Sequence, residues 1–388
     1  MLNTIYNTFQ RIFSRRLPYP TSSPSYSTPS RGSVLLSYLS DVLLWPDDKV
    51  NFLGHSAFWE CKEIVNIFNR MGYDVDVINW SDNSFLPAKK YDVIIDIDSN
   101  LQRLAPFLSN ETVRILHLTG SYGPFQHKAE LARVAAFEQR TGCLYSPKRL
   151  VRWLELAERS LALAGHCSLL GNEFVLSTYP QKYRDKISLI PVSGSVLSRV
   201  RNEIDMMSAG REFLWFFGSG AVHKGLDLVI DYFVKHPDLV LNIAGKFESE
   251  ADFMLAYAEK LKSKNIHVLG YLTPGKPSFG EILKNVSYFI APSCSEGASP
   301  SVVTCLQFGL YPIISHQTGI NLPNGCGLCL DELSCDAIHR AVSKVLSLDH
   351  TEVVRQTFRC QQMALESYSR QAFSKSYAAF SGRVLGVS

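Results

Sequence analysis

Strand-like and helix-like segments alternate along most of this chain, and this alternation constrains its fold more than any other feature. Between residues 33 and 192, short apolar runs such as SVLLSYL and YDVIIDID are separated by long segments with helical spacing, such as PKRLVRWLELAERSLALAG. The alternation begins again at Phe213 and continues to about Leu346. Because this pattern is typical of βαβ units, it predicts an α/β fold with parallel sheets covered by helices.

The length of the chain is sufficient for two domains. Of its 388 residues, 46% are hydrophobic, which is enough to form two cores of ordinary size. A polar run after Gly194 separates the two alternating regions, and a stretch rich in proline, serine and threonine precedes the first. We therefore divide the chain into a flexible N-terminal tail (1–32), a first domain (33–195), a hinge (196–210), a second domain (211–360) and a C-terminal helix (361–388).

Composition also limits the class of protein. A net charge of +3 is too small to indicate nucleic-acid binding. No stretch approaches the roughly 20 apolar residues of a transmembrane helix, and the first residues lack the apolar core of a secretory signal. Nine cysteines in a chain of this size favour reduced thiols. These features predict a cytoplasmic protein without a nucleic-acid partner.

A glycine-rich loop follows an apolar strand in the segment REFLWFFGSGAVHKGLDLVIDYF. Gly218, Ser219 and Gly220 end the strand, and Lys224 opens the next helix. Glycines allow a ligand to approach the backbone closely. Helix N-termini favour anions, so the presence of a positively charged lysine at this position needs a separate explanation. The loop therefore indicates phosphate binding; the alternative is that Asp227 in the first turn simply compensates the lysine. The third glycine of a dinucleotide fingerprint is missing.

A second loop of complementary chemistry lies in APSCSEGASPSVVTCLQFGLYPIIS, residues 291–315, which we interpret as strand, loop, helix and strand. Ser299 and Pro300 are typical of the first residues of a helix. Glu296 and Gly297 are thereby expected just beyond the carboxyl end of a parallel strand, beside free helix N–H groups. Ligands of open α/β sheets bind at such edges, and phosphates bind at helix N-termini.

Together, the two loops resemble the donor site of GT-B glycosyltransferases, specifically the large retaining family 4, or glycosyl transferases group 1. Gly218 and Lys224-Gly225 match the family's first element, and Glu296-Gly297 match the start of its second. The resemblance covers roughly residues 33–375 and is strongest over 211–320. It implies two Rossmann-like domains that face a cleft, with a C-terminal helix that crosses back to the first domain.

The chain departs from the family pattern at two important positions. Ser219 stands where relatives have an arginine that grips the donor diphosphate, and Thr304 stands where they have a second glutamate that bonds the ribose. A hydroxyl can still form hydrogen bonds, but with less energy than an ionised group. The proline of the strand after the second loop, Pro312, is also one place late.

The resemblance implies transfer of a sugar from a nucleotide-diphosphate donor, UDP- or GDP-linked, to a hydroxyl of a glycan or glycoconjugate. It implies retention of anomeric configuration and no obligatory metal. Lys224, loop N–H groups and the helix at 300–308 would stabilise the leaving diphosphate, while Glu296 would contact the donor sugar. The residues implied for donor binding are Gly218, Ser219, Gly220, Lys224, Lys246, Tyr271, Gly297, Ala298, Ser299, Pro300 and Thr304.

Acceptor and catalytic residues are expected in the first domain. By resemblance, His117 after the fourth strand would lie close to the reaction centre; the alternative is a buried, hydrogen-bonded histidine. His55 and Glu60, at the start of the first long helix, would contact the acceptor, unless His55 only caps that helix. Arg133, His127 and Lys128 lie on the helix after His117 and could contact an anionic acceptor. We expect instead that they belong to a solvated face of that helix.

Other functions and features stay open. Because of Ser219 and Thr304, a catalytically weakened GT-B binding or assembly subunit is one alternative, and another phosphosugar enzyme of the same architecture is a second. Cys326, Cys329 and Cys335 have spacings found in zinc sites but lack a fourth ligand, so we predict no metal.

The first 16 residues carry an apolar stripe with arginines as the only charged side chains. One interpretation is a helix that lies on a membrane surface or docks a partner; others are a transit peptide and a weakly ordered tail.

Overall fold

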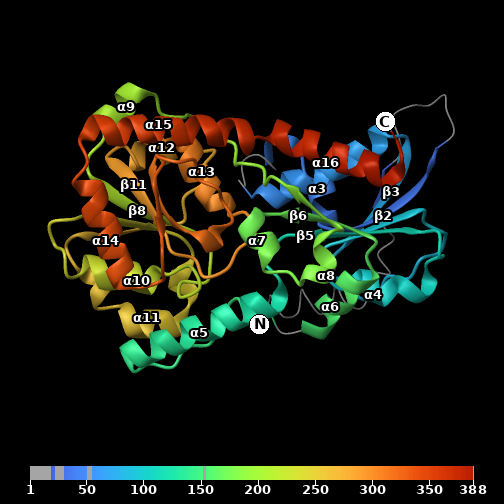
Figure 1. Ribbon diagram of the computed structural model, residues 1–388, viewed down its shortest axis with the longest axis horizontal. Helices are drawn as coiled ribbons and strands as arrows, with labels where there is room; N and C mark the ends of the chain where they lie inside the picture. Colours follow the sequence, from blue (N-terminus) through green and yellow to red (C-terminus); the bar gives the residue numbers. More distant parts are fainter. Residues whose placement is uncertain (1–18, 22–29, 50–54, 152–153, 388) are drawn as a thin grey trace.

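The computed structural model describes residues 19–21, 30–49, 55–151 and 154–387. They form two α/β domains, each built on a largely parallel sheet with helices on both faces (Figure 1). The two domains confirm the fold class that the alternation predicts. No helix in this part of the chain is long and apolar enough to cross a membrane. The interpretation of residues 1–16 falls outside the described residues.

The first domain contains a seven-stranded sheet in the order β1-β3-β2-β4-β5-β6-β7. All neighbours pair in parallel except β1, an antiparallel edge strand. Because β1 lies within the predicted flexible tail, that part of the tail is ordered against β3. The strands are β1 (Tyr19–Thr21), β2 (Gly32–Tyr38), β3 (Tyr73–Asn79), β4 (Val93–Asp96), β5 (Val113–Leu118), β6 (His166–Leu170) and β7 (Ile187–Ile190); the helices between them are α3 (Ser56–Arg70), α4 (Asn100–Leu104), α5 (Gly123–Thr141), α6 (Leu154–Leu163), α7 (Glu173–Ser177) and α8 (Gln181–Arg184).

The second domain contains a six-stranded, fully parallel sheet in the order β10-β9-β8-β11-β12-β13. Its central strands are buried on both faces, which explains why they read as unbroken apolar runs. The elements are β8 (Glu212–Phe216), α10 (Leu226–Phe233), β9 (Leu241–Ala244), α11 (Ala251–Tyr257), β10 (Ile266–Gly270), α12 (Pro277–Ile282), β11 (Val286–Ala291), α13 (Pro300–Phe308), β12 (Tyr311–Ser315), β13 (Leu328–Leu330) and α14 (Cys335–Leu346). Short 3-10 turns lie at Ser40–Leu44, Ala105–Phe107, Phe247–Ser249, Lys260–Lys262 and His316–Thr318.

Two consecutive helices at the end of the chain join the domains. Helix α15 (His350–Ser367) packs against α13 and β12 of the second domain, and α16 (Arg370–Leu385) packs against α3, β6 and β7 of the first (Figure 1). The Ser369 side chain accepts a hydrogen bond from the Ala372 N–H and so begins α16 after the break. The expected return of the C-terminal helix to the first domain is therefore confirmed. One further short helix, α9 (Glu203–Ser208), lies in the predicted hinge.

Helix α5 lies between β5 and β6 of the first domain in sequence, but it extends away from their sheet. It extends under α11 of the second domain (Figure 1). Phe137 stacks on Tyr257, with ring centroids 5.8 Å apart, and Arg133 binds Asp227 of α10. Arg133 is only 5% exposed, so its expected place on a solvated face is wrong; neighbouring Lys128 is exposed. The helix thus forms a fixed connection between the two domains.

Candidate functional site

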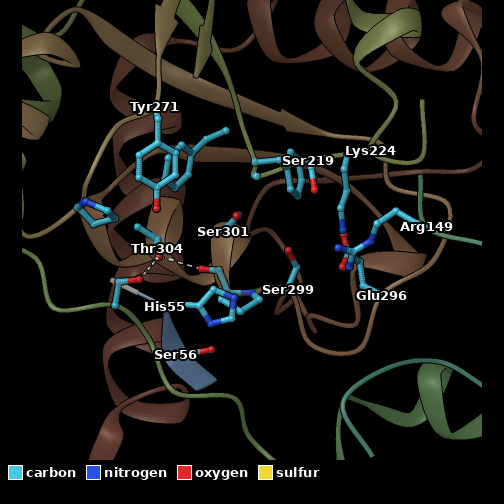
Figure 2. Close-up of a pocket in the computed structure, with 16 residues that line it drawn as sticks. His55, Ser56, Arg149, Ser219, Lys224, Tyr271, Glu296, Ser299, Ser301 and Thr304 are labelled. Carbon is cyan, nitrogen blue, oxygen red and sulfur yellow. Dashed lines mark hydrogen bonds and ion pairs between the residues drawn. The ribbon is translucent and has the colours of Figure 1, made fainter. Parts of the chain in front are cut away.

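A cavity of about 210 Å³ lies where the two domains meet (Figure 2). It is placed at the carboxyl ends of β8 and β11, neighbouring strands of the second sheet, and at the N-termini of α3 and α13. Ligand sites of α/β sheets occur at such edges. The cavity is lined by His55, Ser56, Arg149, Ser195, Phe216, Phe217, Gly218, Ser219, Lys224, Tyr271, Pro274, Glu296, Ser299, Pro300, Ser301 and Thr304.

The two sequence loops meet in an ion pair between Lys224 and Glu296 at one side of the cavity (Figure 2). Both side chains are largely buried, and the Trp215 indole donates a 3.1 Å hydrogen bond to the Lys224 carbonyl. Burial alone would raise the pKa of the Glu296 carboxyl, but Lys224, His223 and Arg149 outweigh it and lower this pKa below its ordinary value. Glu296 is therefore ionised at neutral pH.

The Glu296-Gly297 loop is held against the first domain through its backbone. The Glu296 carbonyl accepts a 3.1 Å hydrogen bond from the Ser121 N–H, and the Ala298 N–H donates to the Leu170 carbonyl at 2.9 Å. A β-carbon on Gly297 would lie 2.6 Å from the Leu170 carbonyl oxygen and equally close to that of Thr119. Glycine is thus required here because the backbone of the other domain approaches so closely.

The glycine loop after β8 is organised by a carboxylate of its own domain. The N–H groups of Gly220 and Ala221 donate to Glu250, with the Gly220 bond at 2.6 Å, and the Tyr145 hydroxyl donates to the same carboxylate at 2.7 Å. Gly220 does not line the cavity. The loop N–H groups that we expected to face a phosphate are, at these two positions, occupied by Glu250.

The N-terminus of α13 offers fewer backbone donors than expected. Besides the Ala298 bond to the first domain, the Ser299 N–H donates to the Thr318 carbonyl at 2.9 Å. Pro300 has no N–H, so Ser301 and Val302 are the next candidates. Their N–H groups make no hydrogen bond within the part of the chain that the structure describes. Backbone N–H contacts from this helix to a ligand would therefore begin at Ser301, although Ser299 and Pro300 also line the cavity.

At the side of the cavity away from the ion pair lie hydroxyl and aromatic side chains. The Thr304 hydroxyl is 3.0 Å from Ser195 Oγ and 2.8 Å from the Pro300 carbonyl oxygen. Tyr271 is half exposed, and the Lys246 ammonium lies 4.5 Å from its ring centroid although Lys246 itself does not line the cavity. An aromatic face with a cation beside it can stack on a planar base.

The proposed acceptor and catalytic residues of the first domain divide into two groups. His55 precedes α3 and lines the cavity; burial there, with Arg149 and Lys246 nearby, lowers its pKa, so the ring is neutral at pH 7. Its side chain makes no capping bond to α3. Glu60 and His117 instead lie in the core of the first domain and do not line the cavity.

The burial of Glu60 and His117 explains why neither belongs to the site. Glu60 accepts hydrogen bonds from the Ser193 N–H and hydroxyl, at 2.8 and 2.9 Å, and burial raises its pKa to about 7. His117 lies 2.8 Å from Ser168 Oγ and packs edge-on against Tyr377 of α16; burial lowers its pKa to about 4. We therefore assign neither residue a role in acceptor binding or catalysis.

Arg149 is the charged residue of the cavity that sequence reasoning missed. It lies in the segment between α5 and α6, where the only local signal is the pair Lys148-Arg149. Its position depends on the course of α5, which carries this segment to the second domain. Other lining residues that we did not predict are Ser56, Ser195, Phe216, Phe217, Pro274 and Ser301.

One group among the described residues has atoms placed as metal ligands could be: Glu130, His223 and Cys294, all buried. His223 already has an oxygen partner at each ring nitrogen, Glu130 on one side and the Ser295 carbonyl on the other. The Cys294 sulfur lies 3.4 Å from Nδ1 of the same histidine. The group is a hydrogen-bonded link between α5 and the loops of the second domain.

Comparison with known proteins agrees with this geometry. Residues 207–358 match the family model described as glycosyl transferases group 1, a span that contains Lys224 and Glu296. A search of curated proteins finds no match.

Solved structures resemble most of the chain at low sequence identity. Sucrose-phosphate synthase from Thermosynechococcus elongatus has a TM-score of 0.65 at 12% identity, over 92% of this chain and 99% of that one. HepE from Anabaena, solved with UDP-glucose, has a TM-score of 0.59 at 10% identity, over 91% and 100%. A glycosyltransferase from Rickettsia africae has a TM-score of 0.57 at 10% identity, over 94% and 100%. At such identities the likeness establishes the fold, and the GT-B architecture is confirmed.

Proposed function

We propose that the cavity between the domains holds a nucleotide-sugar donor. This chain is a glycosyltransferase, and its residues 207–358 match the model of glycosyl transferases group 1. The observation that carries the proposal is the buried pair of Lys224 and Glu296 at the carboxyl ends of β8 and β11. The pair lies beside the N-terminus of a nine-residue helix, α13, which favours an anion.

The ion pair acts as a resting state in this proposal. A buried lysine needs an anionic partner, and in the free protein Glu296 is that partner. When the donor diphosphate enters, it takes over Lys224, and the Glu296 carboxylate becomes free to accept hydrogen bonds from sugar hydroxyls. Glu296 then also lies where positive charge develops at the anomeric carbon as the diphosphate leaves.

The leaving diphosphate is stabilised by Lys224 and by the first open N–H groups of α13. One preorganised donor aimed at developing charge is worth on the order of 3 kcal/mol of barrier. The base would lie toward Tyr271 and Lys246, at the side of the cavity away from the ion pair. A cavity of about 210 Å³ is smaller than typical ligand pockets of about 300–1,000 Å³. Donor binding therefore requires the cavity to widen.

UDP is the nucleotide that we propose, because HepE, which shares the fold, was solved with UDP-glucose. The acceptor is a hydroxyl of a glycan or glycoconjugate that enters from the first domain, where His55 borders the cavity. The transfer proceeds with retention of anomeric configuration.

The proposal is tested by calorimetry of the purified protein with UDP, GDP, ADP and their sugars, with and without magnesium. We expect selective binding of UDP that Lys224→Ala weakens at least tenfold, since a charge-assisted contact is lost. Binding of GDP alone would overturn the choice of base. Unchanged affinity in Lys224→Ala would overturn the phosphate site. The NMR signal of the product's anomeric proton gives its anomeric configuration and so tests retention.

A second function, a binding or assembly subunit with weakened catalysis, is favoured by one observation. Ser219 and Thr304 place hydroxyls where charged groups would bind a donor more strongly, and Glu250 occupies two loop N–H groups. This function predicts that the protein binds the nucleotide sugar without releasing nucleoside diphosphate, even in the presence of acceptor glycans.

A further inference from the structure

Arg149 brings a positive charge into the cavity from the first-domain part of the chain. Figure 2 shows its side chain extending toward Lys224 and Glu296. Within the described residues its guanidinium forms no hydrogen bond and no ion pair, whereas Lys224 is paired with Glu296. Its side chain lies over the glycine loop, since a β-carbon on Gly220 would be 2.9 Å from Arg149 Cγ.

The backbone of Arg149 is fixed by side chains of α5. Its N–H donates to Glu130 Oε1 at 3.1 Å, and its carbonyl accepts from Gln126 Nε2 at 2.8 Å. The other carboxylate oxygen of Glu130 binds His223, two residues after Ala221 in the second-domain loop. Glu130 thus connects the backbone of Arg149 directly to the loop that carries Lys224.

The residues before Arg149 are fixed to the second domain as well. The Tyr145 hydroxyl donates to Glu250, which also holds the glycine loop, and the Ser146 N–H donates to Asp252 at 3.0 Å. A segment held at both ends fixes the backbone of Arg149, so only its exposed side chain has to be ordered on binding. The backbone of the arginine is therefore preorganised relative to the loop, although it belongs to another part of the chain.

The charges of the cavity favour an anion between Lys224 and Arg149. Burial lowers the pKa of Lys224, and the nearby positive charge of Arg149 lowers it further, against the effect of Glu296. Among the residues that line the cavity, the buried Lys224 and the exposed Arg149 face one carboxylate, Glu296, so the lining itself carries a net positive charge. Glu130, which does not line the cavity, also lies near Arg149 but is hydrogen-bonded to His223. A diphosphate that accepts from both cations would offset the positive charge of the lining, and a guanidinium can bind phosphate oxygens with two parallel hydrogen bonds.

We propose that Arg149 is the second cation of the diphosphate site, so that the donor is held between a lysine of the second domain and an arginine carried by the α5 segment. This inference rests on the proposed function, because it assigns a further residue to the same site. Arg149 would also supply the fixed positive charge for the diphosphate, because the glycine loop offers only the Ser219 hydroxyl at the position where relatives have an arginine.

The test compares Arg149→Ala with Lys148→Ala, which removes a neighbouring positive charge that does not line the cavity. Calorimetry would follow binding of UDP, GDP, ADP and inorganic pyrophosphate, and of the nucleoside of whichever nucleotide binds. We expect Arg149→Ala to weaken diphosphate and pyrophosphate binding about 10- to 100-fold, as loss of a charge-assisted contact does. Nucleoside binding should not change, and Lys148→Ala should change diphosphate affinity less than threefold.

Two further variants show whether the guanidinium itself is responsible. Arg149→Lys keeps the charge without the two-bond geometry, so its affinity should fall between wild type and Arg149→Ala. The double variant Arg149→Ala with Ser219→Arg returns a guanidinium to the same cavity from the glycine loop and should recover most of the lost affinity.

The outcomes separate this inference from the proposed function. If Lys224→Ala loses diphosphate binding while Arg149→Ala keeps it, Arg149 has no part in the site and only the inference is overturned. If the wild-type protein binds no nucleoside diphosphate and no pyrophosphate, both are overturned. Equal losses for diphosphate and nucleoside in Arg149→Ala would also contradict a specific phosphate contact.

Discussion

Arg133 of α5 and Asp227 of α10 form a buried, two-bond ion pair between the domains, with Nη2 2.8 and 2.6 Å from the two carboxylate oxygens. Arg140, about two turns further along α5, also binds Asp227 and lies 3.2 Å from Asp231. Asp227 therefore does not simply compensate the lysine that opens α10, as the sequence alone allowed. It anchors the helix that links the first domain to the second.

Replacing Arg133 should destabilise the protein strongly. Arg133→Met removes one partner of a buried pair and leaves Asp227 dependent on Arg140; breaking such a pair costs about 3–5 kcal/mol, with the remaining arginine reducing the loss toward about 3 kcal/mol. Urea unfolding followed by circular dichroism measures it. Arg355→Met, in an exposed pair with Glu352, serves as the control and should be close to wild type. Equal stability of both variants would contradict the anchoring role.

Gly297→Ala should separate the domains at the cavity. Its β-carbon would lie 2.6 Å from two carbonyl oxygens of the first domain, so the backbone must shift and move Glu296. A displacement of about 1 Å at a reacting group can cost on the order of 100-fold in rate. Sugar-transfer assays should show this loss, whereas Gly120→Ala, which meets nothing closer than 3.8 Å, should keep its activity. Wild-type turnover in Gly297→Ala would mean that the loop is free to move.

Glu296→Gln should separate catalysis from binding. The amide keeps the shape but no longer neutralises Lys224, so nucleoside diphosphate affinity should stay equal or rise. Turnover should fall about 100- to 1,000-fold, because the negative charge near the anomeric carbon is lost. Calorimetry and a nucleotide-release assay on the same preparation measure both quantities. Unchanged turnover would remove Glu296 from the mechanism.

The raised pKa of the buried Glu60 predicts that the stability of the first domain depends on pH. Its pKa is about 7 when folded, against 4.5 for the exposed group, so between these pH values the folded state binds more protons than the unfolded state. The free energy of unfolding should therefore fall as pH rises from 4.5 to 7 and stay low above it. Glu60→Gln has no proton to lose and should be more stable than wild type at pH 8, by up to roughly 3 kcal/mol.

Thermal unfolding at pH 5 and pH 8 checks this prediction. The exposed Glu259→Gln is the matched control, and its melting temperature should follow that of wild type at both pH values. A Glu60→Gln variant that loses the same stability as wild type between pH 5 and pH 8 would show that Glu60 is ionised in the folded protein.

Local sequence patterns were enough to predict the elements of the fold and the pair of loops at its centre. Apolar runs and helical spacing depend on neighbouring residues, so the alternation was enough to predict parallel sheets. The same local order places the Lys224 and Glu296 loops after strands β8 and β11, whose carboxyl ends lie at one edge of the sheet. Their contact followed from topology, without knowledge of the other domain.

Which other groups share the site depends on long-range packing that local patterns do not encode. The path of α5, and with it the place of Arg149, depends on contacts such as Arg133 with Asp227, between residues 94 positions apart. Glu60 and His117 look like site residues in sequence, but both are buried in the core of the first domain, Glu60 on the inner face of α3 and His117 against Tyr377 of α16. Local patterns carry no information on how two domains approach each other, because that is set by packing and charge pairing across their interface.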